Sequence, residues 1–395
     1  MLMLSQSPSD PAFIADPYAF YDRARAGAPL FWWRDYDLPC AVSAGAVQAI
    51  LRDRRFGRAW PGGMAPATPA HLAAFYDVEA HSLLELEPPH HTRLRGLVLH
   101  AFTARRIAAL APDIAALARS LADAMPDAPH DLLDSFARPL PVTIIARLLG
   151  VPEAMAPDLL RWSNAMVRMY LAQRSAADEA HAVAATREFV DFLTGYIATR
   201  RARPADDLIT HLILAEENGA RLTTDEMIST CILLLNAGHE ATVHTIGNGV
   251  RQLLTHGVVP DRAKAAAVVE EILRHDPPLH VFTRIAQEDV TLFGHAFARG
   301  DRVQVLLGAA NRDPEIWPDP HRFDPARFAG DRTPQHAAFG AGLHFCLGAP
   351  LARLELQIAL PILFARHPRL TLAGDAPFRD AFHFHGLERL PVRVD

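Results

Sequence analysis

One stretch constrains this chain more than any other: residues 339–348 read Phe-Gly-Ala-Gly-Leu-His-Phe-Cys-Leu-Gly. Cys346 lies there in a glycine-punctuated loop, ahead of Ala349, Pro350 and a long apolar periodic segment that predicts a helix from about Pro350. At a helix start, backbone N–H groups and the positive end of the helix dipole favour a thiolate over a thiol. The stretch therefore predicts that Cys346 is a metal ligand or a nucleophile, whereas Cys40 and Cys231 suit the role of small buried side chains.

The pattern Phe-Gly-x-Gly-x-His-x-Cys-x-Gly resembles the haem-binding loop of the cytochrome P450 family at every signature position. The resemblance implies that Cys346 is the axial thiolate ligand of the iron of haem b. It also implies that Phe339 shields the sulfur and that His344 bonds a haem propionate. Gly340 and Gly348 would let the backbone approach the flat macrocycle, where any Cβ would be in the way.

A second motif follows Pro88 and Pro89, where a helix is predicted to begin. His91 and Arg95 are four residues apart and share one helix face, which suits a pair of carboxylates. The family resemblance places both on the haem propionates and makes Arg284 another propionate partner. Taken alone, the pair could equally be a solvated basic face.

Residues 223–256 are predicted to form one long helix. Thr223-x-x-Glu226 is a capping box at its start, and Gly257 follows its last periodic residue. Gly238 lies in its apolar middle, and an interior glycine costs about 1 kcal/mol relative to alanine, so it requires a reason. In the P450 family the helix loosens at this point to form a groove for dioxygen, and an acid and an alcohol there deliver protons.

By this resemblance Glu240 is the proton source, and Ala237 and Gly238 border the haem. The family's alcohol follows the acid directly, but this chain has Ala241 there. Thr242 cannot simply replace it, because one residue turns a helix by about 100°. We hypothesise that the missing hydrogen bond comes from a substrate hydroxyl, an ordered water, or a neighbour such as Asn236 or Thr245.

The same helix offers a rival interpretation, because His239, Glu240 and His244 superficially resemble a zinc-protease motif. Those proteases place two histidines four residues apart on one face. The spacing here is five, which rotates the second imidazole by about 140° from the first and argues against zinc.

A fourth motif begins with Glu271 and Arg274, which are three residues apart and can form an ion pair. The chain then continues in the P450 order through Pro277, Pro278 and Arg284 to residues 311–323. In that family the pair is buried with a second arginine in a structural triad that supports the haem loop. We predict that Arg322 is the third member, with Arg327 as the alternative.

Substrate contacts are predicted beside these motifs. By the family resemblance, residues just before Arg284 edge the substrate cavity, and the C-terminal segment forms a hairpin that dips into it. The predicted substrate residues are Asn236, His280, Val281, Phe282 and His383. Most of the lining is apolar, which suggests a small natural product, a terpenoid, a macrolide or an aromatic compound.

Composition limits the partners and the cellular location that the chain can have. The 395 residues carry a formal net charge of −6 and no long basic run, which argues against a nucleic-acid partner. Three separated cysteines cannot form a disulfide framework and fit a reducing compartment. The N-terminus lacks a signal-peptide pattern, and no stretch approaches the roughly 20 apolar residues of a membrane span. We expect a cytoplasmic protein with no membrane association.

Periodicity predicts helix after helix from about 105 to 216, with short strands near 31–33, 41–43 and 290–307 and a loop over 57–81. The resemblance implies one P450 domain over residues 1–395, mainly α with small β-sheets. It also implies a monomer that inserts one oxygen atom from O2 into an organic substrate. Electrons would come from a ferredoxin with its reductase, docking near the arginines 93, 105 and 106.

Three alternatives remain at this stage. A haem protein could bind a small molecule without turnover, and Ala241, which stands where the family has its threonine, favours this alternative slightly. A P450 could be driven by peroxide, or could catalyse coupling or dehydration. A non-haem metal enzyme could use the chain's many histidines.

Overall fold

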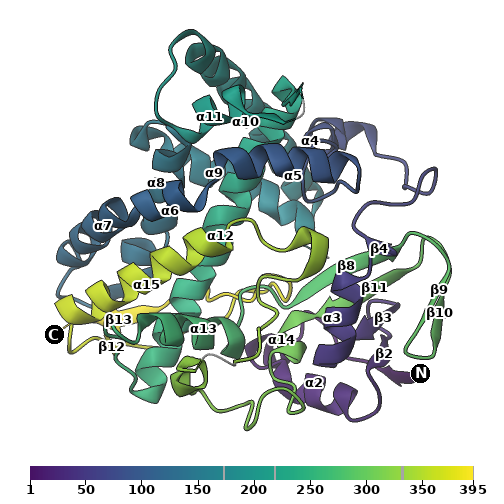
Figure 1. Ribbon diagram of the computed structural model, residues 1–395. Coiled ribbons are helices and arrows are strands. Elements are labelled where there is room, and N and C mark those ends of the chain that lie inside the picture. Colours follow the sequence, from purple (N-terminus) through teal and green to yellow (C-terminus); the bar gives the residue numbers. More distant parts are fainter. Residues whose placement is uncertain (172–173, 218, 331–332, 395) are drawn as a thin grey trace.

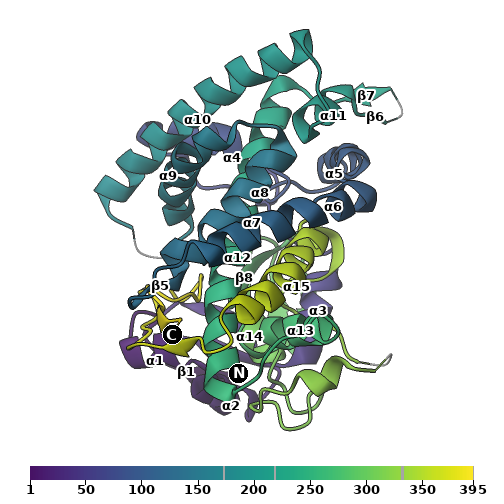
Figure 2. The ribbon, with the colours of Figure 1, turned by 90° about the vertical axis from the view of Figure 1, so that its left-hand side faces the viewer.

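The molecule is arranged around one long helix, α12 (Thr224–His256), in a computed structural model that describes residues 1–171, 174–217, 219–330 and 333–394. Figures 1 and 2 show α12 passing through the middle of the chain, with helices on several sides of it. Its start is the predicted capping box: the Thr223 hydroxyl accepts from the Glu226 N–H, and the Glu226 carboxylate accepts from the Thr223 N–H. Gly257 ends it in a left-handed conformation with φ of 64°.

The expected mainly helical architecture is confirmed. Helices pack around α12 because their apolar faces need cover, and its N-terminal and C-terminal halves lie in two separate hydrophobic clusters of described residues. The other helices are α1 (Pro11–Ala15), α2 (Tyr18–Arg25), α3 (Ala44–Arg52), α4 (Ala73–Glu79), α5 (His90–Ala101), α6 (Ala104–Ala109), α7 (Ala111–Asp123), α8 (Pro139–Leu149), α9 (Ala156–Val167), α10 (Ala176–Ala202), α11 (Leu208–Leu214), α13 (Ala265–His275), α14 (Leu307–Ala310) and α15 (Ala349–Arg366).

The strands form several small sheets: the largest lies at the lower right of Figure 1, and β12 and β13 lie at the lower left, near the C-terminus. In the largest sheet, six strands run in the order β1-β2-β3-β11-β8-β4, with β11 parallel to β3 and antiparallel to β8. Its strands are β1 (Leu2–Leu4), β2 (Leu30–Trp33), β3 (Leu38–Ala41), β4 (Phe56–Gly57), β8 (Val281–Ala286) and β11 (Arg302–Leu306). The others are β5 (His130–Asp131), β6 (Glu216–Glu217), β7 (Ala220–Arg221), β9 (Val290–Leu292), β10 (His295–Phe297), β12 (Thr371–Leu372) and β13 (Pro391–Arg393).

Two local expectations were wrong. Residues 57–81 are not all loop, because α4 forms there and buries Phe75 and Val78 in the helical core. The central helix does not loosen around Gly238: α12 is continuous α-helix from end to end. No helix among the described residues is long and apolar enough to cross a bilayer.

Two glycines that end helices offer a matched stability test. Gly150 ends α8 with φ of 83°, and an added Cβ there would overlap the side chain of Asp207. Asp207 caps α11 by accepting from the Thr210 N–H at 2.8 Å and pairs with Arg200 at 2.6 Å. Gly257 has a similar φ of 64° but open space around it. Gly257→Ala is therefore expected to cost about 1 kcal/mol, the left-handed penalty alone.

Gly150→Ala is expected to cost about 1–2 kcal/mol more than Gly257→Ala, because the new Cβ displaces the Asp207 side chain and α11 loses its N-cap. Urea unfolding of both variants measures the difference in the free energy of unfolding. Equal losses for the two variants would contradict the packing argument.

Candidate active site

The glycine loop folds back on itself just before α15. The Cys346 N–H donates to the Phe339 carbonyl at 3.1 Å, and Gly340 turns the chain with φ of 67°. Burial raises the pKa of the Cys346 thiol, while N–H groups of Gly348 and Ala349 and the charge of Arg95 act in the opposite direction. The Cys346 side chain is nevertheless exposed. A side chain that is both desolvated and accessible faces a space inside the molecule.

The middle of α12 borders an internal space as well. Ala237 is exposed and Ala241 is partly exposed, although α12 is the central helix. The two residues are four apart and so share one face. An added Cβ at Gly238 would meet only Ile145, at 3.6 Å, so packing does not demand this glycine. Small side chains keep one face of α12 open.

Basic side chains gather near the cysteine loop. His91 is buried, neither of its ring nitrogens has a hydrogen-bond partner among the described residues, and burial lowers its pKa to about 4. Its ring lies 4.5 Å from that of His344, measured between centroids. Arg95 donates to the Phe345 carbonyl at 2.8 Å. Glu87 is the acid of this region, 3.3 Å from His344 Nε2.

Arg284 is also buried and has no ion-pair partner among the described residues. It donates to the Thr283 carbonyl at 3.0 Å, and burial lowers its pKa to about 9. A buried guanidinium and an imidazole without partners are costly, and an anionic ligand would satisfy both. The expected haem propionates fit this requirement, and the exposed sulfur of Cys346 fits the expected iron ligand.

Glu240 points into a dense polar group. Its Oε1 accepts from His244 Nε2 at 3.1 Å and from an Arg379 guanidinium nitrogen at 2.7 Å, and its Oε2 lies 3.5 Å from His239 Nε2. Burial alone would raise the pKa of Glu240, but the His244 hydrogen bond and the neighbouring positive charges hold it well below its usual range. These residues line a cavity of about 270 Å³.

The two threonines next to Ala241 are committed to the helix backbone. Thr242 donates to the Gly238 carbonyl at 2.9 Å, and Thr245 donates to the Ala241 carbonyl at 2.7 Å. Their hydroxyl hydrogens are therefore already used within α12. The amide oxygen of Asn236, in contrast, has no partner among the described residues.

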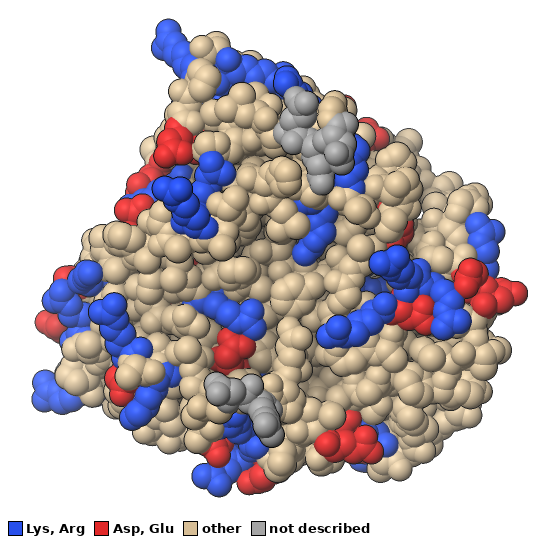
Figure 3. Space-filling view, in the orientation of Figure 1, with Lys and Arg blue, Asp and Glu red and all other residues tan. Residues whose placement is uncertain are grey.

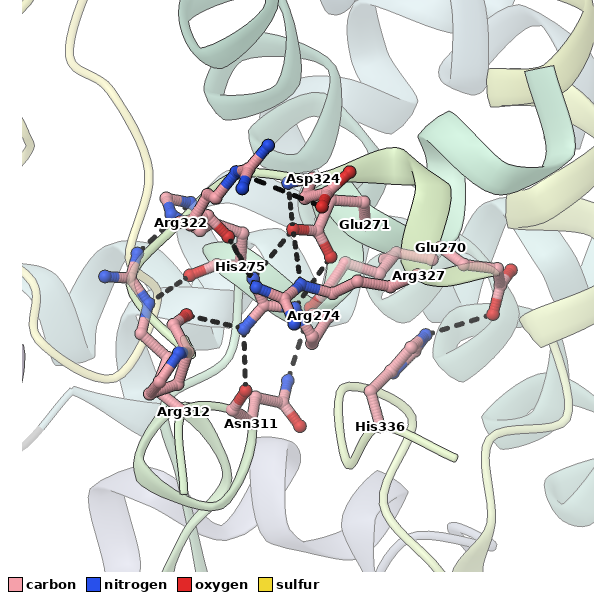
Figure 4. Close-up of polar contacts among 12 residues, drawn as sticks. Glu270, Glu271, Arg274, His275, Asn311, Arg312, Arg322, Asp324, Arg327 and His336 are labelled. Carbon is pink, nitrogen blue, oxygen red and sulfur yellow. Dashed lines mark hydrogen bonds and ion pairs between the residues drawn. The ribbon is translucent and has the colours of Figure 1, made fainter. Parts of the chain in front are cut away.

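Glu271 and Arg274 form the predicted ion pair (Figure 4). Two hydrogen bonds of 2.7 Å join them, and neither side chain has any exposed surface. The remaining guanidinium hydrogens go to backbone carbonyls, among them that of Arg322 at 3.1 Å. Every polar hydrogen of the buried cation thus has an acceptor.

The choice of Arg322 as third triad member was wrong. Its side chain is 66% exposed and lies 3.9 Å from Asp324, so only its carbonyl contributes. The side chain that approaches Glu271 is the alternative, Arg327, with its Nε 3.7 Å from Oε1 (Figure 4). The turn that presents the 322 carbonyl to Arg274 directs the 322 side chain to solvent.

Sequence reasoning missed Glu270, which connects this pair to the cysteine loop. Arg353 on α15 donates to it twice, at 2.6 and 2.8 Å, and His336 lies 3.1 Å away. The Arg353 guanidinium sits 4.5 Å above the Phe339 ring. Two adjacent glutamates were the available signal, but their partners are 66 to 83 residues away in sequence.

Two of the predicted substrate contacts were wrong. His280 has no exposed surface, and its Nδ1 lies 2.9 Å from the Tyr21 hydroxyl. Val281 packs in an aromatic cluster with Phe13 and Tyr18. Strand alternation in β8 sends the side chain at position 281 away from the loop and that at 282 toward it.

The other predicted substrate residues lie near the internal space. An added Cβ at Gly340 would meet Phe282 at 3.3 Å, so this ring touches the cysteine loop. Asn236 contacts the sulfur of Met166 on α9 at 3.8 Å. His383 is partly exposed although burial lowers its pKa to about 4. Their contact with substrate stays a prediction.

Comparisons with known proteins agree with this geometry. The family model described as Cytochrome P450 matches residues 264–375. The monooxygenase PikC of Streptomyces venezuelae is 39% identical over 96% of this chain and 92% of its own. The 6-deoxyerythronolide B hydroxylase of Saccharopolyspora erythraea is 38% identical over 97% of both chains. The solved structure of P450BioI, in complex with an acyl carrier protein that bears hexadec-9Z-enoic acid, matches with a TM-score of 0.90 and 34% identity over 98% of this chain and 100% of that one.

The triad geometry predicts different effects for two nearby arginines. Arg327→Ala removes a side chain that is 12% exposed and faces Glu271, and should cost about 1–3 kcal/mol. Arg322→Ala removes an exposed side chain and should change stability by less than about 0.5 kcal/mol. Urea unfolding and the haem content of the purified variants provide the measurements. A larger loss for Arg322→Ala would restore the original choice.

Proposed function

The chain belongs to the cytochrome P450 family, and from this premise we propose that it inserts one oxygen atom of O2 into a hydroxyl-bearing macrolide. Members of the family are oxidoreductases that bind haem b, and relatives of this chain are named monooxygenases and hydroxylases. When bound, the haem supplies the iron at which dioxygen is reduced. The protein's own residues hold this group, shape the cavity and manage protons.

The accessible sulfur of Cys346, deep inside a basic surrounding, is the observation that carries the proposal. Cys346 is the proposed thiolate ligand, which donates electron density and favours O–O cleavage. His91, Arg95, Arg284 and His344 are the proposed propionate partners. Metal coordination would remove the thiol proton, because a bound cation stabilises the anion strongly.

The substrate proposal starts from the absence of a threonine hydroxyl at position 241. Ala241 has no hydroxyl, and the hydroxyls of Thr242 and Thr245 donate to helix carbonyls. A hydroxyl carried by the substrate would supply the hydrogen bond that the family's threonine normally provides. Among the four substrate classes that an apolar lining allows, the similarity to a hydroxylase of 6-deoxyerythronolide B supports a macrolide.

Electrons are proposed to come from a ferredoxin and its reductase. Arg105 is exposed, but Arg93 pairs with Glu226 and Arg106 donates to the Ala101 carbonyl. Figure 3 shows the Lys and Arg side chains of one face in separate groups, several beside acidic side chains. Steering of an acidic ferredoxin would therefore rest on several small basic groups, and should weaken with salt.

The three free cysteines support the proposed cytoplasmic setting, where the protein would act as a monomer.

The first test is a spectroscopic titration of the purified ferric protein with matched compounds. A macrolide with a hydroxyl near the site of oxidation should displace the iron-bound water and shift the Soret band to its high-spin position. Its deoxy analogue should also bind, through apolar burial, but should give less product per electron consumed when a ferredoxin and its reductase are added. Absence of a Soret band would contradict the cofactor, and binding of terpenoids or simple aromatics alone would contradict the macrolide.

A variant at the missing alcohol tests the role of the substrate hydroxyl. Ala241→Thr should raise the coupling of electrons to product for the deoxy analogue by about tenfold, because a positioned proton donor contributes factors of that order or more. Coupling for the hydroxyl-bearing substrate should change little. Thr242→Val is the control, since its hydroxyl bonds within the helix and should not affect either substrate. No gain for the deoxy analogue would show that the hydroxyl is dispensable.

A further inference from the structure

Two histidines of α12 enclose Glu240, and their hydrogen-bond partners differ. His239 is 1% exposed, and its Nδ1 lies 3.2 Å from the Leu235 carbonyl and 3.3 Å from the Ser163 hydroxyl. A carbonyl can only accept a hydrogen bond, so the Leu235 contact requires a hydrogen on Nδ1, and we take this tautomer of the neutral ring as part of the inference that the NMR test below checks. The other nitrogen, Nε2, then presents a lone pair.

That lone pair has no hydrogen-bond partner among the described residues. It faces Glu240 Oε2 across 3.5 Å, and this oxygen belongs to a carboxylate. Two lone pairs at that distance repel each other when no hydrogen lies between them. One added proton converts the repulsion into a charge-assisted hydrogen bond, whichever of the two groups carries it.

His244 and Arg379 surround the other oxygen of Glu240. Nε2 of His244 lies 3.1 Å from Oε1 and 3.3 Å from Nη1 of Arg379, while its Nδ1 lies against Gly386 and has no partner among the described residues. Because Arg379 donates to Oε1, Oε2 is the oxygen left to exchange a proton.

The pair has access to water and a positive surrounding. It borders the cavity of about 270 Å³, which is polar and large enough to hold several waters. The charged and titratable groups around this cavity come from several elements: Arg138, Arg168, His244, Arg379 and Glu388. Asp134 and Asp178 already pair with Arg138 and Arg168.

We propose that His239 and Glu240 together hold one exchangeable proton, which water in this cavity replaces and which monooxygenation consumes. His239 would thus be a residue that carries a proton for the reaction through Glu240 and water. The inference rests on the proposed function. Oxidation of a substrate C–H to C–OH by O2 releases one water and takes up two electrons, supplied by the ferredoxin, and two protons. One of these protons leaves the His239–Glu240 pair, and a proton from bulk solvent, passed along water molecules in the cavity, replaces it.

The pKa directions support this arrangement. Burial lowers the pKa of His239, and the charge of Glu240 raises it in part. The Glu240 carboxylate is held ionised by its donors, so the shared proton resides mainly on His239 when the pair is loaded. A nitrogen whose pKa burial has lowered releases its proton readily.

The test is nitrogen NMR of ¹⁵N-histidine in the reduced, carbon monoxide-bound holoenzyme, which is diamagnetic. The His239 signals are assigned by their loss in His239→Gln. At high pH they should show the Nδ1–H form, and on acidification Nε2 should take up a proton. Glu240→Gln should lower the midpoint of that titration by about 1–3 units, because the neighbouring anion is gone. An Nε2–H form across the whole range would overturn the proposal.

Turnover provides the second readout. His239→Gln should lower the coupling of electrons to product and raise peroxide release by about tenfold, with unchanged substrate affinity. His211→Asn, on α11 beside Asp206, is the matched control and should not change coupling. Haem content and thermal midpoint establish that each variant is folded. If the wild type gives no product, the proposed function fails; if it gives product and His239→Gln is equally coupled, the inference alone fails.

Discussion

The buried ion pair between Glu271 and Arg274 is the interaction on which the surroundings of the cysteine loop depend. Removing two charges from water is expensive, and their mutual attraction compensates only when every remaining hydrogen is satisfied. Here carbonyls of Asn311, Pro320 and Arg322 accept the rest of the guanidinium hydrogens. The pair therefore fixes the path of a long irregular segment that has little regular secondary structure to hold it. Loss of one partner would leave a buried charge and a segment without an anchor.

Glu270, the neighbour of this pair, extends the same support to the site. Arg353 reaches it from α15 and also covers the Phe339 ring, so one glutamate connects α13, α15 and the loop. The loop can then keep its cysteine in an internal space, next to small side chains of α12 and to His91 and Arg284, which have no ion-pair partner among the described residues. Such a combination is unstable by itself, because the open space and a buried guanidinium without a counter-ion both cost free energy. An anionic, flat ligand removes both costs at once, and the fold is thus completed by its cofactor.

The sequence predicts those parts of the molecule whose physics is local. The capping box of α12, its end at Gly257 and the helix expected from about Pro350 depend on neighbours within a few residues, and all three are present, the last one starting at Ala349. The ion pair at 271 and 274 is local too. The choice of the third arginine is not determined locally, because whether Arg322 or Arg327 faces Glu271 depends on how a turn is oriented against α13. His280 likewise looked available for substrate because its partners, Tyr21 and His385, are more than 100 residues away. The short helix α4 escaped notice because its apolar pattern spans fewer than three turns.

Three buried glutamates show why the surroundings of an acid, and not its burial, decide what it can do. Burial raises the pKa of Glu355 to about 8 and that of Glu79 to about 7, because neither has enough donors or positive charge nearby to offset desolvation. Glu240 is similarly buried, yet His244 and Arg379 hold its pKa well below the usual range. A carboxylate that is so strongly stabilised is a poor proton donor on its own. It is, however, well suited to hold a proton on a neighbouring base, and His239 presents to it an Nε2 that has no hydrogen-bond partner in the described part of the chain. The acid of this helix is thus best understood as the fixed anion of a pair, with the imidazole as the group that gains and loses the proton.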